Sequence, residues 1–323
     1  MTDQEPTAAP AGVPPNLTAT YVSADRYGFL ERDGARLRYA CWNVPGTARG
    51  TVVVLTGRGE FIDKYATEVV GELLGRGYAV IAMDWRGQGL SDRPLADRNK
   101  GHIDNFATYV ADLQLFLDKI VAPTAPRPIL ALCHSMGAHI VLRALAENGS
   151  GPFAAGLLVS PMTGLRREAM LRSVLLLMPE VPAVEERYLF GTGPFLLLAR
   201  EFNSNFVTHD ERRYCFTEEW YAADPRLTLG GPTLGWARQA VRSMTAALAP
   251  GVLERIELPL LVISAGQDQL IDSKTHAPVV ARLKRGEHLT IAGAKHEVMM
   301  ETDDLRALFW EAFDRLAKDV TGR

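Results

Sequence analysis

Cysteine is scarce in this chain, and neither sign of charge is in large excess. The 323 residues include only three cysteines, Cys41, Cys133 and Cys215, and no CxxC pair. An odd, widely spaced set argues against both a disulfide framework and a zinc site, so a reducing compartment is expected. The formal net charge is -3 and the basic residues are scattered, so no nucleic-acid partner is expected.

Long apolar runs are also missing. The longest, such as residues 174–178 and 194–199, are far too short to cross a bilayer. The N-terminal residues include Asp3 and Glu5 but no basic stretch followed by an apolar core. We therefore interpret residues 1–20 as a disordered tail and not as a signal peptide. A cytoplasmic protein is the resulting prediction.

What the sequence does contain is a regular alternation of strand-like and helix-like segments, in a composition that is 47% apolar. Asp33-Gly34 lies between two short alternating segments and predicts a hairpin. Alternating strands and helices predict an α/β fold, a mostly parallel sheet with helices on both faces. The strands are expected near residues 51–55, 79–83, 129–134, 155–160, 259–264 and 288–291, and the helices near 64–76, 106–119, 138–147 and 303–317.

The alternation stops between residues 161 and 247. This segment contains helical stretches rich in Leu, Met and aromatic residues, with Pro and Gly between them, and no buried strand is expected in it. Because the strand pattern resumes at residue 259, we predict an inserted helical cap and not a second independent domain. The expected core is residues 21–160 and 248–323, and the expected cap is residues 161–247.

Ser135 follows the apolar run at 129–134 and precedes a segment with helical spacing. A serine at such a bend is typical of the nucleophile elbow, G-x-S-x-G. Cys133 occupies the first glycine position of that pattern, and Gly137 occupies the second. Since cysteine is small and Gly137 lets the helix pack close to its strand, we predict that Ser135 is a nucleophile. An ordinary serine N-cap is the alternative.

Two other strand ends carry the partners that a serine nucleophile needs. Asp268 and His296 follow the last two predicted strands, and parallel sheets place their ligands at the carboxyl ends of strands. The imidazole would take the serine proton, and the carboxylate would orient the imidazole. The order Ser135, Asp268, His296 is that of α/β-hydrolases. Asp272 is the alternative acid, although it is further from the strand end and suited to capping a helix.

An oxyanion hole requires backbone N–H groups that point at the developing negative charge. One is expected from Met136, the residue after the nucleophile, and the other from Arg58 in the loop after the strand at 51–55. Gly57 and Gly59 would let that loop approach a substrate closely. The alternative is a flexible loop whose glycines serve only a turn. This chemistry needs neither a metal nor an organic cofactor.

Five motifs together resemble the lysophospholipase L2 and monoacylglycerol lipase branch of the α/β-hydrolase superfamily, of the serine aminopeptidase S33 type. The matching segments are 57–60 (GRGE), 84–91 (DWRGQGLS), 134–137 (HSMG), Asp268 and 293–296 (GAKH), and the cap segment 229–236 (LGGPTLGW) is similar to bacterial lysophospholipase L2-like proteins. Thr56 stands where the branch usually has His, and Cys133 where the elbow usually has Gly. The resemblance implies hydrolysis of a carboxylic ester through an acyl-enzyme, with a lysophospholipid or monoacylglycerol as the favoured substrate.

The cap leaves several interpretations open. Residues 171–178 and 195–198 either line an acyl tunnel or form the core of the cap. Its arginines either attract head groups and a membrane surface, which would make the protein peripheral, or form a solvated face. An aminopeptidase-like or small-ester hydrolase is the alternative function, and a non-catalytic binding protein is a further one; the oligomeric state is not indicated. The arginines are Arg166, Arg167, Arg172, Arg200, Arg212 and Arg213, and the carboxylates that an aminopeptidase could use are Glu185, Glu186, Glu218 and Glu219.

Overall fold

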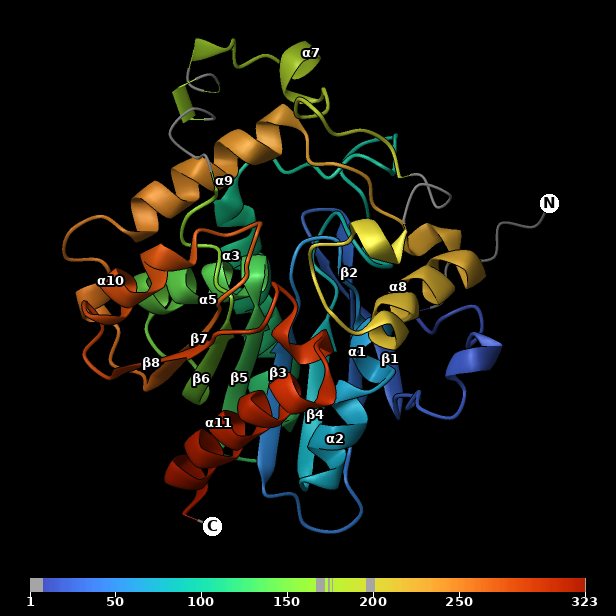
Figure 1. The fold of residues 1–323 in the computed structure, drawn as a ribbon, viewed down its shortest axis with the longest axis vertical. Coiled ribbons are helices and arrows are strands. Elements are labelled where there is room, and N and C mark those ends of the chain that lie inside the picture. The colour runs from blue at the N-terminus through green and yellow to red at the C-terminus, as the bar shows by residue number, and fades with distance from the viewer. Residues whose placement is uncertain (1–7, 167–171, 174, 176, 196–200, 323) are drawn as a thin grey trace.

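An eight-stranded sheet forms the centre of the molecule in the computed structural model, which describes residues 8–166, 172–173, 175, 177–195 and 201–322 (Figure 1). The strand order is β1-β2-β4-β3-β5-β6-β7-β8. Strands β3 to β8 run parallel, whereas β2 is antiparallel to both of its neighbours. The predicted mostly parallel sheet is therefore confirmed. The strands are β1 (Arg26–Arg32), β2 (Ala35–Trp42), β3 (Gly50–Leu55), β4 (Tyr78–Met83), β5 (Ile129–His134), β6 (Phe153–Val159), β7 (Leu260–Ala265) and β8 (Gly286–Ile291).

The predicted hairpin joins β1 to β2. Asp33 and Gly34 both have positive φ angles, 51° and 73°, and Arg32 pairs directly with Ala35. A two-residue turn with this backbone matches the twist of the strands that it connects.

Helices cover both faces of the sheet, because alternate residues of each buried strand point to opposite sides. Val53 and Leu55 of β3 pack with α3 and α5, whereas Val52 and Val54 pack with α1, α2 and α11. Figure 1 shows α2 and α11 in front of the sheet. The helices are α1 (Ile62–Ala66), α2 (Val69–Gly75), α3 (Phe106–Phe116), α4 (Ala122–Thr124), α5 (Ser135–Asn148), α7 (Pro182–Glu185), α8 (Glu211–Ala223), α9 (Leu234–Ala247), α10 (His276–Val280) and α11 (Asp303–Thr321).

Short helical turns complete the chain. The 3-10 turns are η1 (Pro15–Leu17), η4 (Phe202–Ser204), η5 (Pro225–Leu227), η6 (Leu253–Arg255), η7 (Ser273–Thr275) and η8 (Val298–Met300), and η2 (Leu117–Val121) is a π-helical turn. No helix in the described ranges is long and apolar enough to span a bilayer.

Two segments differ from expectation. The helix expected over residues 64–76 is divided into α1 and α2, since Glu68 leaves helical geometry with φ -147° and ψ -53° and its carboxylate pairs with Arg213 of the cap. Within the tail expected to be disordered, Leu17 is buried against Phe61 and Trp220. That contact removes apolar surface from water and packs this part of the segment onto the molecule.

The chain between β6 and β7 contributes α7, α8 and α9 and, in its described residues, no strand of the sheet. In Figure 1, α7 and α9 lie toward the end of the molecule opposite the C-terminus, and α8 lies at the side, next to α1. Apolar residues of α9 belong to the same buried cluster as α3 and α5. We keep residues 161–247 as the proposed extent of the cap.

Candidate active site

Ser135 lies at the sharp turn from β5 into α5 and has a φ of 49°, a backbone conformation that is rare for a non-glycine residue. Strain of this kind is found at functional sites that the surrounding structure holds in place. Gly137 explains how the elbow is accommodated, because a Cβ there would meet the carbonyl oxygens of Thr56 and Leu55 at 2.4 and 2.5 Å. Cys133 is fully buried in the core on one face of the sheet. Burial raises the pKa of its thiol, so Cys133 is a packing residue in protonated form.

The structure brings Ser135, His296 and Asp268 together, although they are far apart in the sequence. His296 Nε2 is 3.0 Å from Ser135 Oγ, and His296 Nδ1 is 2.6 Å from Asp268 Oδ2. All three side chains are at least nine-tenths buried. The series has the geometry in which a histidine can take the serine proton while a carboxylate fixes its tautomer.

Asp268 and Asp272, the two candidate acids, have different surroundings. Asp268 Oδ1 accepts hydrogen bonds from the N–H groups of Leu270 and Ile271, at 2.8 and 2.9 Å, which orient Oδ2 toward His296. Burial by itself would raise the pKa of Asp268, but the hydrogen bond and charge of His296 outweigh it and hold that pKa below its usual value. Asp272 accepts from Lys274 N–H and caps η7.

The loop after β3 is held firmly beside the nucleophile. Gln88 donates to the carbonyl of Gly57 (2.7 Å) and accepts from the N–H of Gly59 (3.2 Å). In the described part of the chain, no acceptor pairs with the Arg58 N–H. Met136 is the second residue of α5, where a helix leaves its N–H groups without partners in the helix. Both residues border the same cavity as Ser135, as an oxyanion hole requires.

Glu60 connects this loop to the elbow, a role that the sequence motif did not reveal. Its carboxylate accepts from the Gly57 N–H, lies 2.8 Å from His134 Nδ1 and pairs with Lys64 at 2.8 Å. Burial by itself would raise the pKa of Glu60, but His134 and Lys64 hold it well below its usual range. Burial likewise opposes the charge on His134, yet Glu60 raises the His134 pKa above its usual value. The carboxylate therefore stays ionised and can hold both segments.

Thr56, where the branch usually has His, is fully buried. Within the described residues its hydroxyl oxygen has no hydrogen-bond partner. Its backbone carbonyl accepts from Trp85 Nε1 at 2.8 Å. Trp85 and Gln88, both from the DWRGQGLS motif, therefore support the loop around Arg58 by bonds that do not need the missing histidine.

Ser135 and His296 border a cavity of about 1060 Å³ between the core and the cap. This volume lies at the upper end of the range for small-molecule sites. The two stretches expected to line an acyl tunnel do not do so in their described residues: Leu175 is buried elsewhere, Leu177 is 87% exposed, and Phe195 packs on Tyr221. Residues 171, 174, 176 and 196–198 lie outside the described part. The apolar lining includes Met162, Leu165, Leu189, Phe206, Leu229 and Trp236.

The loop that carries His296 is bonded directly to the cap. The Glu297 N–H donates to the carbonyl of Val207 at 2.8 Å, and Lys295 Nζ donates to the carbonyl of Thr208 at 3.2 Å. Both neighbours of His296 thus contact cap residues. The position of the imidazole therefore depends on how the cap is seated.

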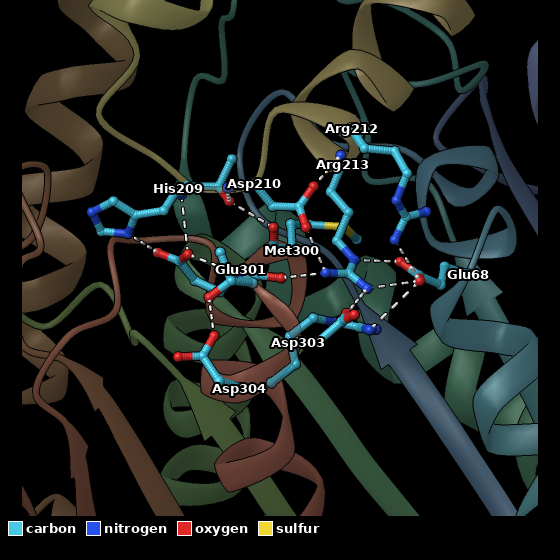
Figure 2. Close-up of polar contacts among 12 residues, drawn as sticks. Glu68, His209, Asp210, Arg212, Arg213, Met300, Glu301, Asp303 and Asp304 are labelled. Carbon is cyan, nitrogen blue, oxygen red and sulfur yellow. Dashed lines mark hydrogen bonds and ion pairs between the residues drawn. The ribbon is translucent and has the colours of Figure 1, made fainter.

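Arg213 anchors this part of the cap (Figure 2). Its buried guanidinium pairs with Glu68 at 2.6 Å, with Asp210 at 2.8 Å and with Asp303, and it donates to the carbonyl of Glu301 at 2.6 Å. These contacts join α8 to the junction of α1 and α2 and to the start of α11. Sequence reasoning could not find the contacts to the core, because those partners lie 88 to 145 residues away.

Some of the cap arginines that were expected to bind lipid head groups instead form contacts within the protein. Arg213 is buried, Arg212 pairs with Glu68 at 3.1 Å, and Arg166 donates to the backbone carbonyl of Asp268 at 2.9 Å. The ion pairs of Arg212 and Arg213 reduce the charge that the cap can present to a membrane, whereas Arg166 stays exposed. The remaining members are Arg172, which is exposed, and Arg167 and Arg200, which lie outside the described residues. Within the described ranges, no cluster of His, Cys, Asp and Glu could hold a metal ion.

A mostly parallel sheet with a serine at the β5–α5 elbow, and Asp268 and His296 at the ends of β7 and β8, defines the α/β-hydrolase class. Residues 46–303 match the family model described as serine aminopeptidase, S33, and the chain belongs to that family.

Relatives support the same branch that the motifs indicated. The chain is 33% identical over 302 residues to lysophospholipase L2 of Escherichia coli (strain K12), covering 90% of this chain and 87% of that protein. It is 24% identical over 279 residues to human monoglyceride lipase, covering 85% and 84%. The structure of a soluble variant of monoglyceride lipase from Saccharomyces cerevisiae, in complex with a substrate analog, aligns with a TM-score of 0.71 at 18% identity, covering 92% of this chain and 97% of that one. This last similarity shows the shared fold.

Proposed function

We propose that the protein hydrolyses the carboxylic ester of monoacyl lipids, lysophospholipids or monoacylglycerols, through an acyl-enzyme. The observation that carries the proposal is the hydrogen-bonded series Asp268–His296–Ser135 beside a large cavity with many apolar side chains. The similarity to proteins named lysophospholipase L2 and monoglyceride lipase supports the choice of substrate.

In the proposed mechanism, Ser135 Oγ attacks the ester carbonyl while His296 Nε2 takes its proton. Asp268 remains ionised and stabilises the imidazolium that forms. The backbone N–H groups of Arg58 and Met136 stabilise the tetrahedral oxyanion, a contribution of roughly 3 kcal/mol for each donor. His296 then protonates the leaving alcohol and activates the water that releases the fatty acid.

The nucleophile is tested by the Ser135→Ala variant. It should lose about 10⁴-fold or more in turnover while keeping its unfolding temperature. The Ser204→Ala variant, which removes an exposed cap hydroxyl that donates to the Glu201 carbonyl, should keep full activity. Substantial turnover by the Ser135→Ala enzyme would rule out the mechanism.

The substrate class is tested with nitrophenyl esters of increasing chain length, beside lysophosphatidylcholine, monoacylglycerol and an aminoacyl anilide. The value of kcat/KM should rise with acyl length up to a limit set by the cavity, because each added methylene buries more apolar surface, about 0.8 kcal/mol per CH₂. A preference for acetyl over decanoyl esters would contradict a lipid substrate.

The aminopeptidase alternative has less support in the geometry. A cap carboxylate that captured the amino terminus of a peptide should face the cavity, and Glu185 instead pairs with Arg238 at 2.6 Å. Rapid cleavage of the aminoacyl anilide would favour this alternative. The other cap carboxylates considered, Glu186, Glu218 and Glu219, are likewise absent from the described cavity lining.

We also propose that the protein is cytoplasmic and meets the membrane surface through its cap. Exposed apolar side chains support this contact: Leu177 is 87% exposed and Phe190 is 64% exposed. Phe206, itself part of the cavity lining, is also exposed. Exposed apolar groups near a lipid-binding cavity suit a surface that touches a bilayer. Sedimentation with phospholipid vesicles, weakened in the Phe190→Ser variant, would test the contact.

A further inference from the structure

Arg58 contributes more than a backbone N–H to the proposed site. Its Nη2 donates to the carbonyl of Gly230 at 2.7 Å, and the guanidinium carbon lies 5.3 Å from the centre of the Trp236 ring. Its Nε is buried and has no hydrogen-bond partner within the described ranges, nor does any carboxylate there form an ion pair with the side chain. The cation is therefore placed between core and cap without an opposite charge.

Such an arrangement is costly for the protein alone. Removing a charge from water is unfavourable unless a partner of opposite charge replaces the water. Burial accordingly lowers the pKa of Arg58 to about 10. Since Arg58 borders the same cavity as Ser135, an anionic group in that cavity would supply the missing charge.

The other cations that border the cavity do not share this property. Lys64 is buried but is neutralised by Glu60 and Glu297, at 2.8 and 2.7 Å. Arg166 and Lys274 are exposed to solvent, where water and salt screen their charge. Arg58, whose Nε is buried and without a partner within the described residues, is thus the lining cation best prepared for an anion.

We propose that the guanidinium of Arg58 binds the phosphate of a lysophospholipid substrate and makes the enzyme favour phosphate-bearing monoacyl lipids over neutral ones. The inference rests on the proposed function. The Arg58 N–H would contact the ester oxygen while its side chain reaches the phosphate. The glycerol unit that separates ester from phosphate is about as long as an arginine side chain. A planar guanidinium also matches phosphate oxygens in a two-point contact.

A simpler explanation is that Arg58 only holds the cap against the core. Arg93 offers a matched control for that explanation. Arg93 is also a partly buried arginine bonded to backbone carbonyls of both parts, those of Gly89 and Arg226 at 3.1 Å among them. Burial also lowers its pKa to about 10. It does not belong to the described cavity lining, so removing it should disturb the cap without affecting phosphate binding.

The experiment compares kcat/KM for 1-acyl lysophosphatidic acid and for the 1-monoacylglycerol with the same acyl chain, in mixed micelles. In Arg58→Gln the ratio of the two values should fall at least about tenfold, as expected for the loss of a charge-assisted hydrogen bond. The ratio for Arg58→Lys should lie between those of the wild type and Arg58→Gln, since lysine keeps the positive charge but cannot make the two-point contact of a guanidinium. Arg93→Gln should leave the ratio unchanged. An unchanged ratio in Arg58→Gln, or an equal shift in Arg93→Gln, would overturn the inference.

A second measurement does not depend on the variants folding. Glycerol 3-phosphate should inhibit the wild-type hydrolysis of monoacylglycerol competitively, and glycerol should not; absence of inhibition by glycerol 3-phosphate would count against the phosphate site. Inorganic phosphate inhibiting as strongly would show a site for free phosphate and contradict a head-group role. A wild-type enzyme that hydrolyses neither lipid would instead refute the proposed function itself.

Discussion

At the scale of single residues, two aspartates four positions apart are expected to differ completely in importance. Asp268→Asn should reduce kcat by about 10⁴-fold, because the amide would hold His296 in the wrong tautomer. Asp272→Asn should keep near-normal turnover and lose at most about 1 kcal/mol of stability, since Asn also caps helices well. Steady-state kinetics and urea unfolding of both variants check this. The reverse pattern of activity would assign the acid to Asp272.

Gly137 makes a similarly local prediction about the elbow. In Gly137→Ala the added methyl group would press on two backbone carbonyl oxygens that cannot move aside, which should destabilise the fold by roughly 1–3 kcal/mol. Gly75, near the end of α2, has open space around its missing Cβ. Gly75→Ala should therefore be neutral or slightly stabilising. Equal unfolding temperatures for the two variants would contradict the close approach at the elbow.

At the scale of elements, the seating of α8 on the core depends on one buried cation. Arg213 is 2% exposed and pairs with Glu68, whereas its neighbour Arg212 pairs with the same carboxylate from a side chain that is 53% exposed. The same carboxylate thus meets a buried and an exposed arginine. Comparing substitutions of Arg212 and Arg213 therefore tests the effect of burial, because both variants remove the same charge next to the same carboxylate.

Arg213→Met should lower the free energy of unfolding by about 3 kcal/mol, since Glu68 and Asp210, both mostly buried, lose the buried cation that joins them. It should also lower kcat, because the loop that carries His296 is bonded to the cap segment that Arg213 anchors. Arg212→Met should change stability by less than about 1 kcal/mol. Urea unfolding and turnover of the two variants measure both effects. Similar losses in both would show that burial does not decide the strength of this anchor.

At the scale of the whole molecule, two buried histidines should make stability depend on pH in opposite directions. His139 of α5 contacts Ser243 of α9 at 2.7 Å, and burial, with a smaller effect of Arg143, lowers its pKa to about 3. As the pH falls below about 6.5, His139 therefore becomes protonated in the unfolded chain but stays neutral in the folded protein. The contribution of His139 is present above pH 6.5 and declines as the pH falls toward 3.

The stability difference between the wild type and His139→Gln should accordingly shrink by about 1.4 kcal/mol for each pH unit below 6. For His134, whose pKa is raised by Glu60, the contribution is full below pH 6.5 and is lost as the pH rises through the folded value. The difference between the wild type and His134→Gln should thus shrink with rising pH. Urea unfolding between pH 4.5 and 8.5 gives both curves, and parallel curves would disprove the assignment.

Local patterns in the sequence were enough to predict the sheet, the Asp33–Gly34 hairpin and the proposed reactive residues. A strand buried on both faces needs a continuous apolar run, and parallel strands bring their carboxyl ends to one edge. Ser135, Asp268 and His296 could therefore be proposed together, and the structure brings them within hydrogen-bond reach.

Contacts between distant segments were decided only by the tertiary structure. The break between α1 and α2 goes with the contact between Glu68 and Arg213, which are 145 residues apart. The cavity lining differs from the expected tunnel, because the side chains that face a cavity depend on how cap and sheet pack. Arg58 reaches Gly230 across 172 residues. The periodicity of apolar residues in the sequence indicates which side chains are buried. Which side chains they contact depends on how the whole chain folds.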